Sequence, residues 1–273
     1  MNCLPKLSGL PPSVSASAGT TLPAEDASGF AKPFVHDEGH LRSLHFTEAE
    51  LQSRTNLWHP WRLEVDYTRT MMGFLLLHSE PVHIGMIGLG GGSLAKFCHH
   101  ELPNCRISVA ENNPHVLALR REFAVPSDSA RFEVLKADGA AFVAARNASF
   151  DVLLVDGFDH QGQPASLCTQ AFYDDCHTAL RPGGVLVVNL HQDDADYLLW
   201  VERLLRSCSG NAVEVPAPEK SNCIVFASRD SVLLPRRVNL KQSLAAVGEA
   251  ARLQLRAEFA RINWYLKNPT DSG

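Results

Sequence analysis

The chain has 273 residues, of which 45% are hydrophobic and 20% charged, and its formal net charge is −5. This balance is typical of a globular protein and excludes a chain that is disordered throughout. No stretch is dense in Lys and Arg, so we expect no nucleic-acid partner, and the negative charge is compatible with a cationic ligand. The longest apolar run, residues 71–77, is far shorter than the ~20 residues that cross a bilayer. We therefore expect no membrane partner and interpret this run as a buried helix.

Residues 1–31 are rich in Ser, Ala, Gly, Pro and Thr and have almost no hydrophobic periodicity. This composition predicts a disordered leader that does not join the core. The leader lacks the basic start and continuous apolar segment of a signal peptide, and the seven cysteines show no CxxC spacing. We therefore expect a cytoplasmic protein with free thiols and no metal site.

The next two segments predict a small β unit followed by a helix. Apolar and polar residues alternate between positions 40 and 46, which indicates that residues 32–65 form an N-terminal β-hairpin unit. Residues 66–77 are interpreted as a helix that leads into the main domain. At the other end of the chain, residues 240–266 place Leu, Ala, Val and Phe at helical spacing, so we expect residues 231–273 to be a helical tail.

Between these ends, residues 66–230 predict one α/β domain. Strand-like and helix-like segments alternate, with helices at 93–100 and 114–123, and the apolar run 152–155 is typical of a strand buried on both faces. We therefore predict a Rossmann-like, mostly parallel seven-stranded sheet, with an antiparallel strand finishing it because the last two strands follow each other closely. The strand candidates are 83–89, 107–111, 132–137, 151–156, 185–190, 212–215 and 223–227.

A glycine-rich loop follows the first of these strands. It reads IGLGGGSL at 87–94, with glycines at Gly88, Gly90, Gly91 and Gly92. Glycines at a strand–helix junction let the backbone turn sharply and approach a ligand in front of the helix N-terminus. The spacing is GxGxG rather than the GxGxxG of dinucleotide sites, so we treat the four glycines as candidate cofactor-binding residues of another nucleoside.

Acidic residues end the next three predicted strands. Glu111 follows Gly92 by 19 residues, where a carboxylate accepts ribose hydroxyls. Asp138 is placed to bind the adenine amine, and Asp156 and Asp159 follow the fourth strand. Each acid alone also fits a helix N-cap or a solvated loop. Together they lie at the rim where open α/β sheets bind ligands, and they favour a positively charged sulfonium nucleoside over a dinucleotide.

With these motifs the chain resembles the spermidine synthase family, the polyamine aminopropyltransferases, from about residue 32 to residue 229. It looks like a bacterial spermidine-synthase-like branch in which the glycine loop reads GLGGGSLAKF. The motifs that carry the resemblance are DYTRTM at 66–71, IGLGGGSL at 87–94, ENNP at 111–114, ADG at 137–139 and DGFDHQGQP at 156–164.

The resemblance implies an S-adenosylmethionine-dependent transferase fold, a small-molecule polyamine substrate and a homodimer. Decarboxylated S-adenosylmethionine would be the co-substrate, donating an aminopropyl group to a diamine such as putrescine and leaving methylthioadenosine. On the nucleoside side, the resemblance implies that the glycine loop, Glu111 with Asn112, and Asp138 with Gly139 bind the donor.

On the amine side, the resemblance implies that Asp156 lies beside the attacking amine, that Asp159 helps to hold the polyamine and that Tyr67 lines the amine channel. An alkyl amine with a pKa of about 10 is protonated at neutral pH, so it attacks carbon only after losing a proton. A nearby carboxylate attracts the cation and accepts that proton. His160 is a candidate substrate-binding residue or auxiliary base, and Asn189 is a candidate acceptor contact.

The chain departs from the family pattern on the donor-tail side. Gly91 stands where the family usually has an Asp that binds the amine of the donor, and the Gln and Glu of a family Tyr-Gln-Glu-Met segment are absent at 67–71. Two alternatives therefore stay open. One is methyl transfer from S-adenosylmethionine, whose carboxylate Arg69 would attract, and the other is a non-catalytic nucleoside-binding role. The pair Asp156 and Asp159 favours aminopropyl transfer.

Overall fold

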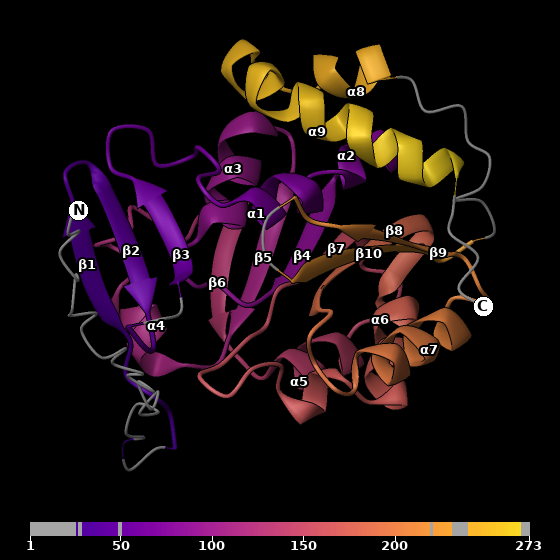
Figure 1. The fold of residues 1–273 in the computed structure, drawn as a ribbon, viewed down its shortest axis with the longest axis horizontal. Helices are drawn as coiled ribbons and strands as arrows, with labels where there is room; N and C mark the ends of the chain where they lie inside the picture. The colour runs from indigo at the N-terminus through magenta and orange to yellow at the C-terminus, as the bar shows by residue number, and fades with distance from the viewer. Residues whose placement is uncertain (1–25, 27–28, 49–50, 219–220, 231–239, 269–273) are drawn as a thin grey trace, which may run out of the picture.

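The computed structural model describes residues 26, 29–48, 51–218, 221–230 and 240–268. These residues form a three-stranded N-terminal sheet beside a seven-stranded sheet that has helices on both faces (Figure 1). The order of the large sheet is β6-β5-β4-β7-β8-β10-β9. Its strands are β4 (His83–Ile87), β5 (Arg106–Glu111), β6 (Phe132–Lys136), β7 (Phe150–Val155), β8 (Leu180–His191), β9 (Ala212–Pro216) and β10 (Asn222–Ser228).

All seven predicted strands are present, and the prediction of a mostly parallel sheet is confirmed. Neighbouring strands from β6 to β8 run parallel, whereas β10 runs antiparallel to both β8 and β9. The last strand of the chain, β10, is antiparallel as expected; it lies between β8 and β9, so β9 forms the edge of the sheet. Every residue of β7 is buried, as its apolar run predicted.

Helices cover the two faces of the sheet in separate groups (Figure 1). One face carries α1 (Asp66–Met71), α2 (Phe74–Leu77), α3 (Ser93–Glu101), α8 (Leu240–Ala245) and α9 (Glu249–Lys267). The other carries α5 (Gly139–Ala144), α6 (Gln170–Ala179) and α7 (Tyr197–Ser207). The short helix α4 (Pro114–Ala118) follows β5, and a 3₁₀ turn, η1 (Ala165–Leu167), precedes α6.

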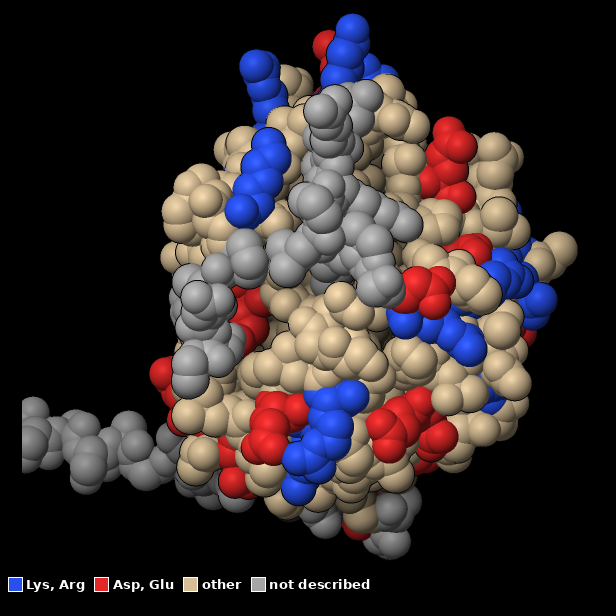
Figure 2. Space-filling view, turned by 90° about the vertical axis from the view of Figure 1, so that its right-hand side faces the viewer, with Lys and Arg blue, Asp and Glu red and all other residues tan. Residues whose placement is uncertain are grey.

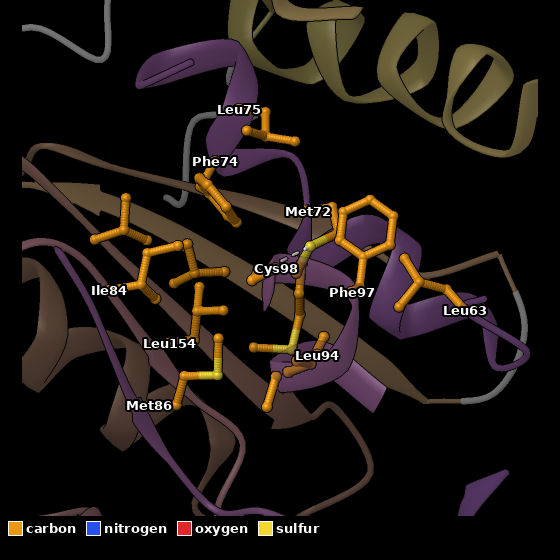
Figure 3. Close-up of a cluster of buried hydrophobic side chains, with 14 of the residues drawn as sticks. Leu63, Met72, Phe74, Leu75, Ile84, Met86, Leu94, Phe97, Cys98 and Leu154 are labelled. Carbon is orange, nitrogen blue, oxygen red and sulfur yellow. Dashed lines mark hydrogen bonds between the residues drawn. The ribbon is translucent and has the colours of Figure 1, made fainter. Parts of the chain in front are cut away.

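The apolar run at 71–77 lies in the larger hydrophobic core, as predicted. Met72 and Phe74 pack with Ile84 of β4 and with Phe97 and Cys98 of α3 (Figure 3). Met72 and Phe74 are completely buried. This core fastens α1 and α3, the two helices that frame the candidate site, against the same sheet face.

The N-terminal unit is larger than the hairpin predicted. It has three antiparallel strands, β1 (Phe34–Glu38), β2 (Leu41–His45) and β3 (Leu51–Asn56). The third strand shows no hydrophobic alternation because its buried side chains are polar: Ser53, Thr55 and Asn56 are 6%, 0% and 5% exposed.

Three predicted helices end or break earlier than expected. The helix at 66–77 is divided at Gly73, where the amide bonds to Thr70 O in a 3₁₀ manner. The helix at 114–123 ends at Ala118 and continues as turns. The tail helix is divided at Gly248, whose extended backbone lets its N–H donate to Glu101 Oε2 at 2.7 Å.

Most of the predicted leader, residues 1–25 and 27–28, lies outside the described residues. Its last residue contradicts the expectation that the leader stays apart from the core. Ala31 is only 2% exposed, and its carbonyl oxygen accepts a hydrogen bond from Asn113 Nδ2 at 2.9 Å. A backbone contact to the loop after β5 thus brings this segment to the candidate site.

Two simpler expectations concern the described residues alone. The six cysteines among them are buried and free, in agreement with the thiols predicted. No helix in the described ranges is both long and apolar enough to span a membrane.

Candidate active site

A large cavity opens where the strand order of the sheet reverses. The loop after β4 lies between those after β5 and β7, the position at which open α/β sheets bind ligands. The cavity measures ≈ 1040 Å³. No Lys or Arg occurs among the described residues that line it, whereas six carboxylates do: Glu111, Asp138, Asp156, Asp159, Asp193 and Asp194. Such a cavity favours cationic ligands.

The glycine loop packs directly against the loop that carries Asp156. Gly88 has φ 89°, and a Cβ added there would lie 2.1 Å from the carbonyl oxygen of Asp156. Only glycine meets both the backbone conformation and the contact. The amide of Asp156 in turn donates to Ile87 O at 2.9 Å, so the floor of the cavity is fixed by backbone contacts.

The four predicted glycines divide into two pairs. Gly88 and Gly90 line the cavity, but Gly91 and Gly92 lie behind it. A Cβ on Gly91 would meet Ser53 Oγ at 2.7 Å and Phe123 Cδ1 at 2.8 Å. Gly92 has φ 73° and forms the N-cap of α3. The Cα atoms of this pair face β3 and the segment after α4, and the binding of a cofactor by all four glycines stays a prediction.

Glu111 is held at the cavity wall by backbone amides. Its Oε2 accepts from Leu89 N at 2.9 Å, and its Oε1 accepts from Asn113 N at 2.8 Å. Burial raises the pKa of this carboxyl, and the N–H donors of Asn113 and Leu89 oppose the shift. Because a carboxylate oxygen accepts more than one hydrogen bond, both oxygens retain capacity for ribose hydroxyls. Asn112, its exposed neighbour, also lines the cavity.

Asp138 combines a structural role with a place in the lining. It is the N-cap of α5, and its Oδ1 accepts from Ala141 N at 2.9 Å. Asp138 is exposed, and Gly139 beside it is buried; both line the cavity. One carboxylate oxygen of Asp138 therefore caps the helix, and the residue also lies at the rim of the sheet where it was predicted.

Asp156 is held by hydrogen bonds from two side chains. Its Oδ2 accepts from the Tyr67 hydroxyl at 3.0 Å, and its Oδ1 accepts from Asn189 Nδ2 at 2.8 Å. Burial raises the pKa of Asp156, and the hydrogen bonds from Asn189 and Tyr67 oppose that shift. Burial and the neighbouring carboxylate raise the pKa of Tyr67 well above its ordinary value, so the phenol stays a donor at neutral pH.

Asp159 and His160 follow on the same loop. Asp159 Oδ1 accepts from Gln161 N at 2.7 Å, which folds the loop into a tight turn. The His160 ring lies edge-on to Phe46 of the N-terminal unit, with ring centroids 6.4 Å apart. Both residues line the cavity together with Tyr67 and Asp156, so the structure brings the predicted catalytic and substrate-binding residues to one place.

Arg69 does not face the cavity. Its Nη1 donates to Leu63 O at 2.8 Å, and its guanidinium pairs with Asp66 one turn earlier on α1. The idea that Arg69 attracts a donor carboxylate is therefore wrong, because local partners on its own helix and the preceding segment engage it. Within the described ranges, no group of three or more His, Cys, Asp or Glu residues has a geometry that could hold a metal ion.

Comparison with known proteins decides the family. The spermine/spermidine synthase domain matches residues 64–216, more than half of the chain. This chain belongs to that family. Relatives named polyamine aminopropyltransferase include one from Chromobacterium violaceum, 41% identical over 72% of this chain and 76% of the relative. Another, from Neisseria meningitidis serogroup A, is 39% identical over 78% of this chain and 81% of the relative.

Solved structures support the fold of this spermidine synthase family member. A probable spermidine synthase from Corynebacterium glutamicum has a TM-score of 0.64 and 20% identity over 78% of this chain and 82% of its own. A spermidine synthase in complex with the transition-state analogue AdoDATO has a TM-score of 0.56 and is 20% identical, and the match covers 85% of this chain and 89% of that one. Human methyltransferase-like protein 13 in complex with SAH has a TM-score of 0.54 and is 21% identical, and the match covers 76% of this chain and 96% of that one. The predicted Rossmann-like transferase fold is thereby confirmed.

Sequence reasoning missed several residues of this family member's cavity, among them two carboxylates and an amide. Asp193 and Asp194 lie on the loop after β8, and Asn222 begins β10, where its Nδ2 donates to Asn189 Oδ1 at 2.9 Å. The two acids follow a predicted strand, so the same strand-end reasoning that found Asp156 applies to them. Asn222 is the first residue of β10 and lies just before the predicted strand 223–227, and no local pattern marks it.

Proposed function

We propose that this cavity transfers an aminopropyl group from decarboxylated S-adenosylmethionine to a diamine such as putrescine, releasing methylthioadenosine. The observation that carries the proposal is the carboxylate of Asp156, held between Tyr67 and Asn189 inside an acidic cavity. Membership of the spermine/spermidine synthase family and relatives named polyamine aminopropyltransferase support it.

The nucleoside half of the donor is assigned to the side of the cavity under the glycine loop. There Gly88 and Gly90 leave room for a ligand at the strand ends, and Glu111 presents a carboxylate fixed by two amides. Asp138 lies one strand further out, where the adenine ring would reach. The spermidine synthase solved with AdoDATO has the same fold, which supports placing the adenosyl group here.

The charge of the cavity favours a decarboxylated donor. An S-adenosylmethionine carboxylate would meet six carboxylates and no Lys or Arg among the described lining residues. Arg69, the cation nearest in sequence to Tyr67, is engaged by Asp66 and Leu63 O. Methyl transfer is the second candidate because human methyltransferase-like protein 13, solved with SAH, shares the fold. The described lining residues include no Lys or Arg to pair with the carboxylate of S-adenosylmethionine.

The acceptor amine reacts at Asp156. Asp156 accepts a proton from the ammonium group and aims the freed lone pair at the carbon beside the sulfonium. The new nitrogen–carbon bond forms as the carbon–sulfur bond breaks, and the electron pair of that bond neutralises sulfur as the thioether of methylthioadenosine. Asp159 lies on the same loop and would attract the distal ammonium of the diamine. The homodimer implied by family resemblance stays a prediction, which light scattering of the purified chain would check.

The test supplies the purified protein with putrescine and either decarboxylated S-adenosylmethionine or S-adenosylmethionine. Mass spectrometry quantifies methylthioadenosine, spermidine and S-adenosylhomocysteine. We expect equal amounts of methylthioadenosine and spermidine with the decarboxylated donor, and neither with S-adenosylmethionine. S-adenosylhomocysteine formed in the second reaction, without spermidine in the first, would replace the proposal by methyl transfer.

A further inference from the structure

Three side chains form a hydrogen-bonded chain across three neighbouring strands of the sheet. Asn222, at the start of β10, donates from Nδ2 to Asn189 Oδ1 at 2.9 Å, and Asn189 Nδ2 donates to Asp156 Oδ1 at 2.8 Å. Asn189 is 1% exposed and Asn222 is 5% exposed. The pairing of β10 with β8 places His191 opposite Asn222 and Ile224 opposite Asn189, which brings the two amides together.

The direction of this chain depends on Asn222. A carboxamide has an N–H₂ side and a carbonyl side, and a buried polar group needs a partner for each. Because Asn222 donates to the carbonyl of Asn189, the N–H₂ of Asn189 is turned toward Asp156. An Asn189 turned the other way would present its carbonyl to Asp156, which suits only a protonated carboxyl. The orientation of one amide thus selects the charge state of the carboxyl beyond it.

We propose that Asn222 is a positioning residue that keeps Asp156 ionised for proton acceptance by fixing the orientation of Asn189. This inference rests on the proposed function, since it explains how the base of that reaction stays a carboxylate. Asn222 acts through Asn189 and has no assigned contact with the reacting amine.

The surroundings of Asp156 explain the need for such a device. The titratable groups that line the cavity with it are Tyr67, Glu111, Asp138, Asp159, His160, His191, Asp193 and Asp194. Five of those eight are carboxylic acids and none is Lys or Arg, so near neutral pH the negative charge of the five carboxylates disfavours ionisation of Asp156, as burial does. Hydrogen bonds donated by Tyr67 and Asn189 act in the opposite direction.

The experiment measures kcat/KM for putrescine from pH 5 to pH 9 in the wild-type protein and in Asn222→Leu, a substitution of similar volume. Without the orienting donor, the pKa of Asp156 rises. As the pH is lowered, Asp156 is then protonated sooner, so the variant loses activity at a higher pH than the wild-type protein does. We expect the acid-side midpoint to rise by about one pH unit, with kcat/KM about tenfold lower below the midpoint and nearly unchanged on the alkaline plateau. In Asn222→Asp the new carboxylate accepts a hydrogen bond from Asn189 and turns the carbonyl of Asn189 toward Asp156. This variant should shift the midpoint further.

Ser221→Asp is the matched control for charge, because it adds a carboxylate next to Asn222 without replacing it. Its midpoint should move less than that of Asn222→Asp. Equal shifts in the two Asp variants, together with an unshifted Asn222→Leu, would overturn the inference. A kcat/KM lowered equally at every pH would also overturn it, since that result indicates a merely structural role.

A readout independent of turnover separates this inference from the proposed function. ¹³C NMR of labelled Asp side chains follows the titration of Asp156 in the wild-type protein and in Asn222→Leu, with Asp156→Asn to assign the signal. We expect the pKa of Asp156 to be higher in Asn222→Leu. If the wild-type protein makes no spermidine, the proposed function fails, and the carboxyl titration still decides the role of Asn222.

Discussion

Gly91 occupies a crowded position between the N-terminal unit and the segment after α4. Ser53 Oγ and the Phe123 ring lie 2.7 and 2.8 Å from the place a Cβ would take, and Phe123 is 1% exposed. The family Asp expected at this position from the resemblance therefore has no room here.

Introducing that aspartate should destabilise the protein instead of improving donor binding. We expect Gly91→Asp to lower the free energy of unfolding by about 2 kcal/mol, because overpacking a core typically costs 1–3 kcal/mol. Urea unfolding measures the change, and Asn112→Asp, which adds the same charge to an exposed residue of the next loop, serves as control. A stable Gly91→Asp protein with a lower KM for the decarboxylated donor would contradict this account.

The candidate site could be predicted where chain topology alone brings residues together. Glu111, Asp138 and Asp156 all follow parallel strands, whose carboxyl ends meet at one rim whatever the details of packing. Asn222 reaches the same rim at the amino end of the antiparallel β10, and only the pairing of β10 with β8 reveals it. The sequence likewise did not reveal the partner of Arg69, because a charged residue on a helix can face solvent, bind a ligand or pair with Asp66.

At the scale of elements, α3 is tied to the N-terminal sheet by a buried ammonium group. Lys96 is 3% exposed, and its Nζ donates to Thr55 Oγ1 and to Phe123 O, both at 2.8 Å. Burial lowers the pKa of Lys96 to about 7. The joint between α3 and β3, which frames the glycine loop, therefore holds a lysine that loses its proton easily.

This joint should make stability depend on pH. Between pH 7 and about 10 the unfolded chain keeps the Lys96 proton while the folded chain releases it, so the stability of the wild-type protein rises with pH. Relative to Lys96→Met, we expect a gain of up to about 1.4 kcal/mol per pH unit in this window. Urea unfolding at pH 7, 8 and 9 measures both proteins. Parallel stability curves would show that Lys96 stays protonated when folded.

The fold could be predicted at the level of strands better than at the level of helix ends. The alternation of strand-like and helix-like segments predicted all seven strands of the large sheet. The strand β3 was not predicted because its buried side chains are polar, and long-range contacts determine where the helices break. Gly248 is the N-cap of α9, and its amide donates to Glu101 of α3. Such a contact joins residues 147 positions apart, so no local pattern encodes it.

At the scale of the whole molecule, the cavity differs in charge from the face of the surface that Figure 2 shows. On the face shown in Figure 2, Lys and Arg side chains are intermixed with Asp and Glu. The cavity, in contrast, has six carboxylates and no Lys or Arg among the described lining residues. A dication should therefore be drawn to this opening by a field that salt weakens.

This field predicts salt-dependent binding of the acceptor. Raising the ionic strength from about 0.05 to about 0.5 M should increase the KM for putrescine several-fold and leave kcat within about twofold. Initial-rate assays measure both constants. In the double variant Asp193→Asn with Asp194→Asn, the salt effect should be smaller, because two charges at the cavity mouth are gone. A KM that does not change with salt would contradict the electrostatic account.

The most direct test of the account removes the proposed base and keeps its shape. Asp156→Asn should lower the rate of methylthioadenosine and spermidine formation at least a hundredfold, because proton acceptance typically contributes 10²–10⁴-fold. The affinity for methylthioadenosine, measured by calorimetry, should stay within about twofold of the wild-type value, since Glu111 and the glycine loop are unchanged. Turnover close to that of the wild-type protein would show that Asp156 is not the base and that the proposed reaction centre is misplaced.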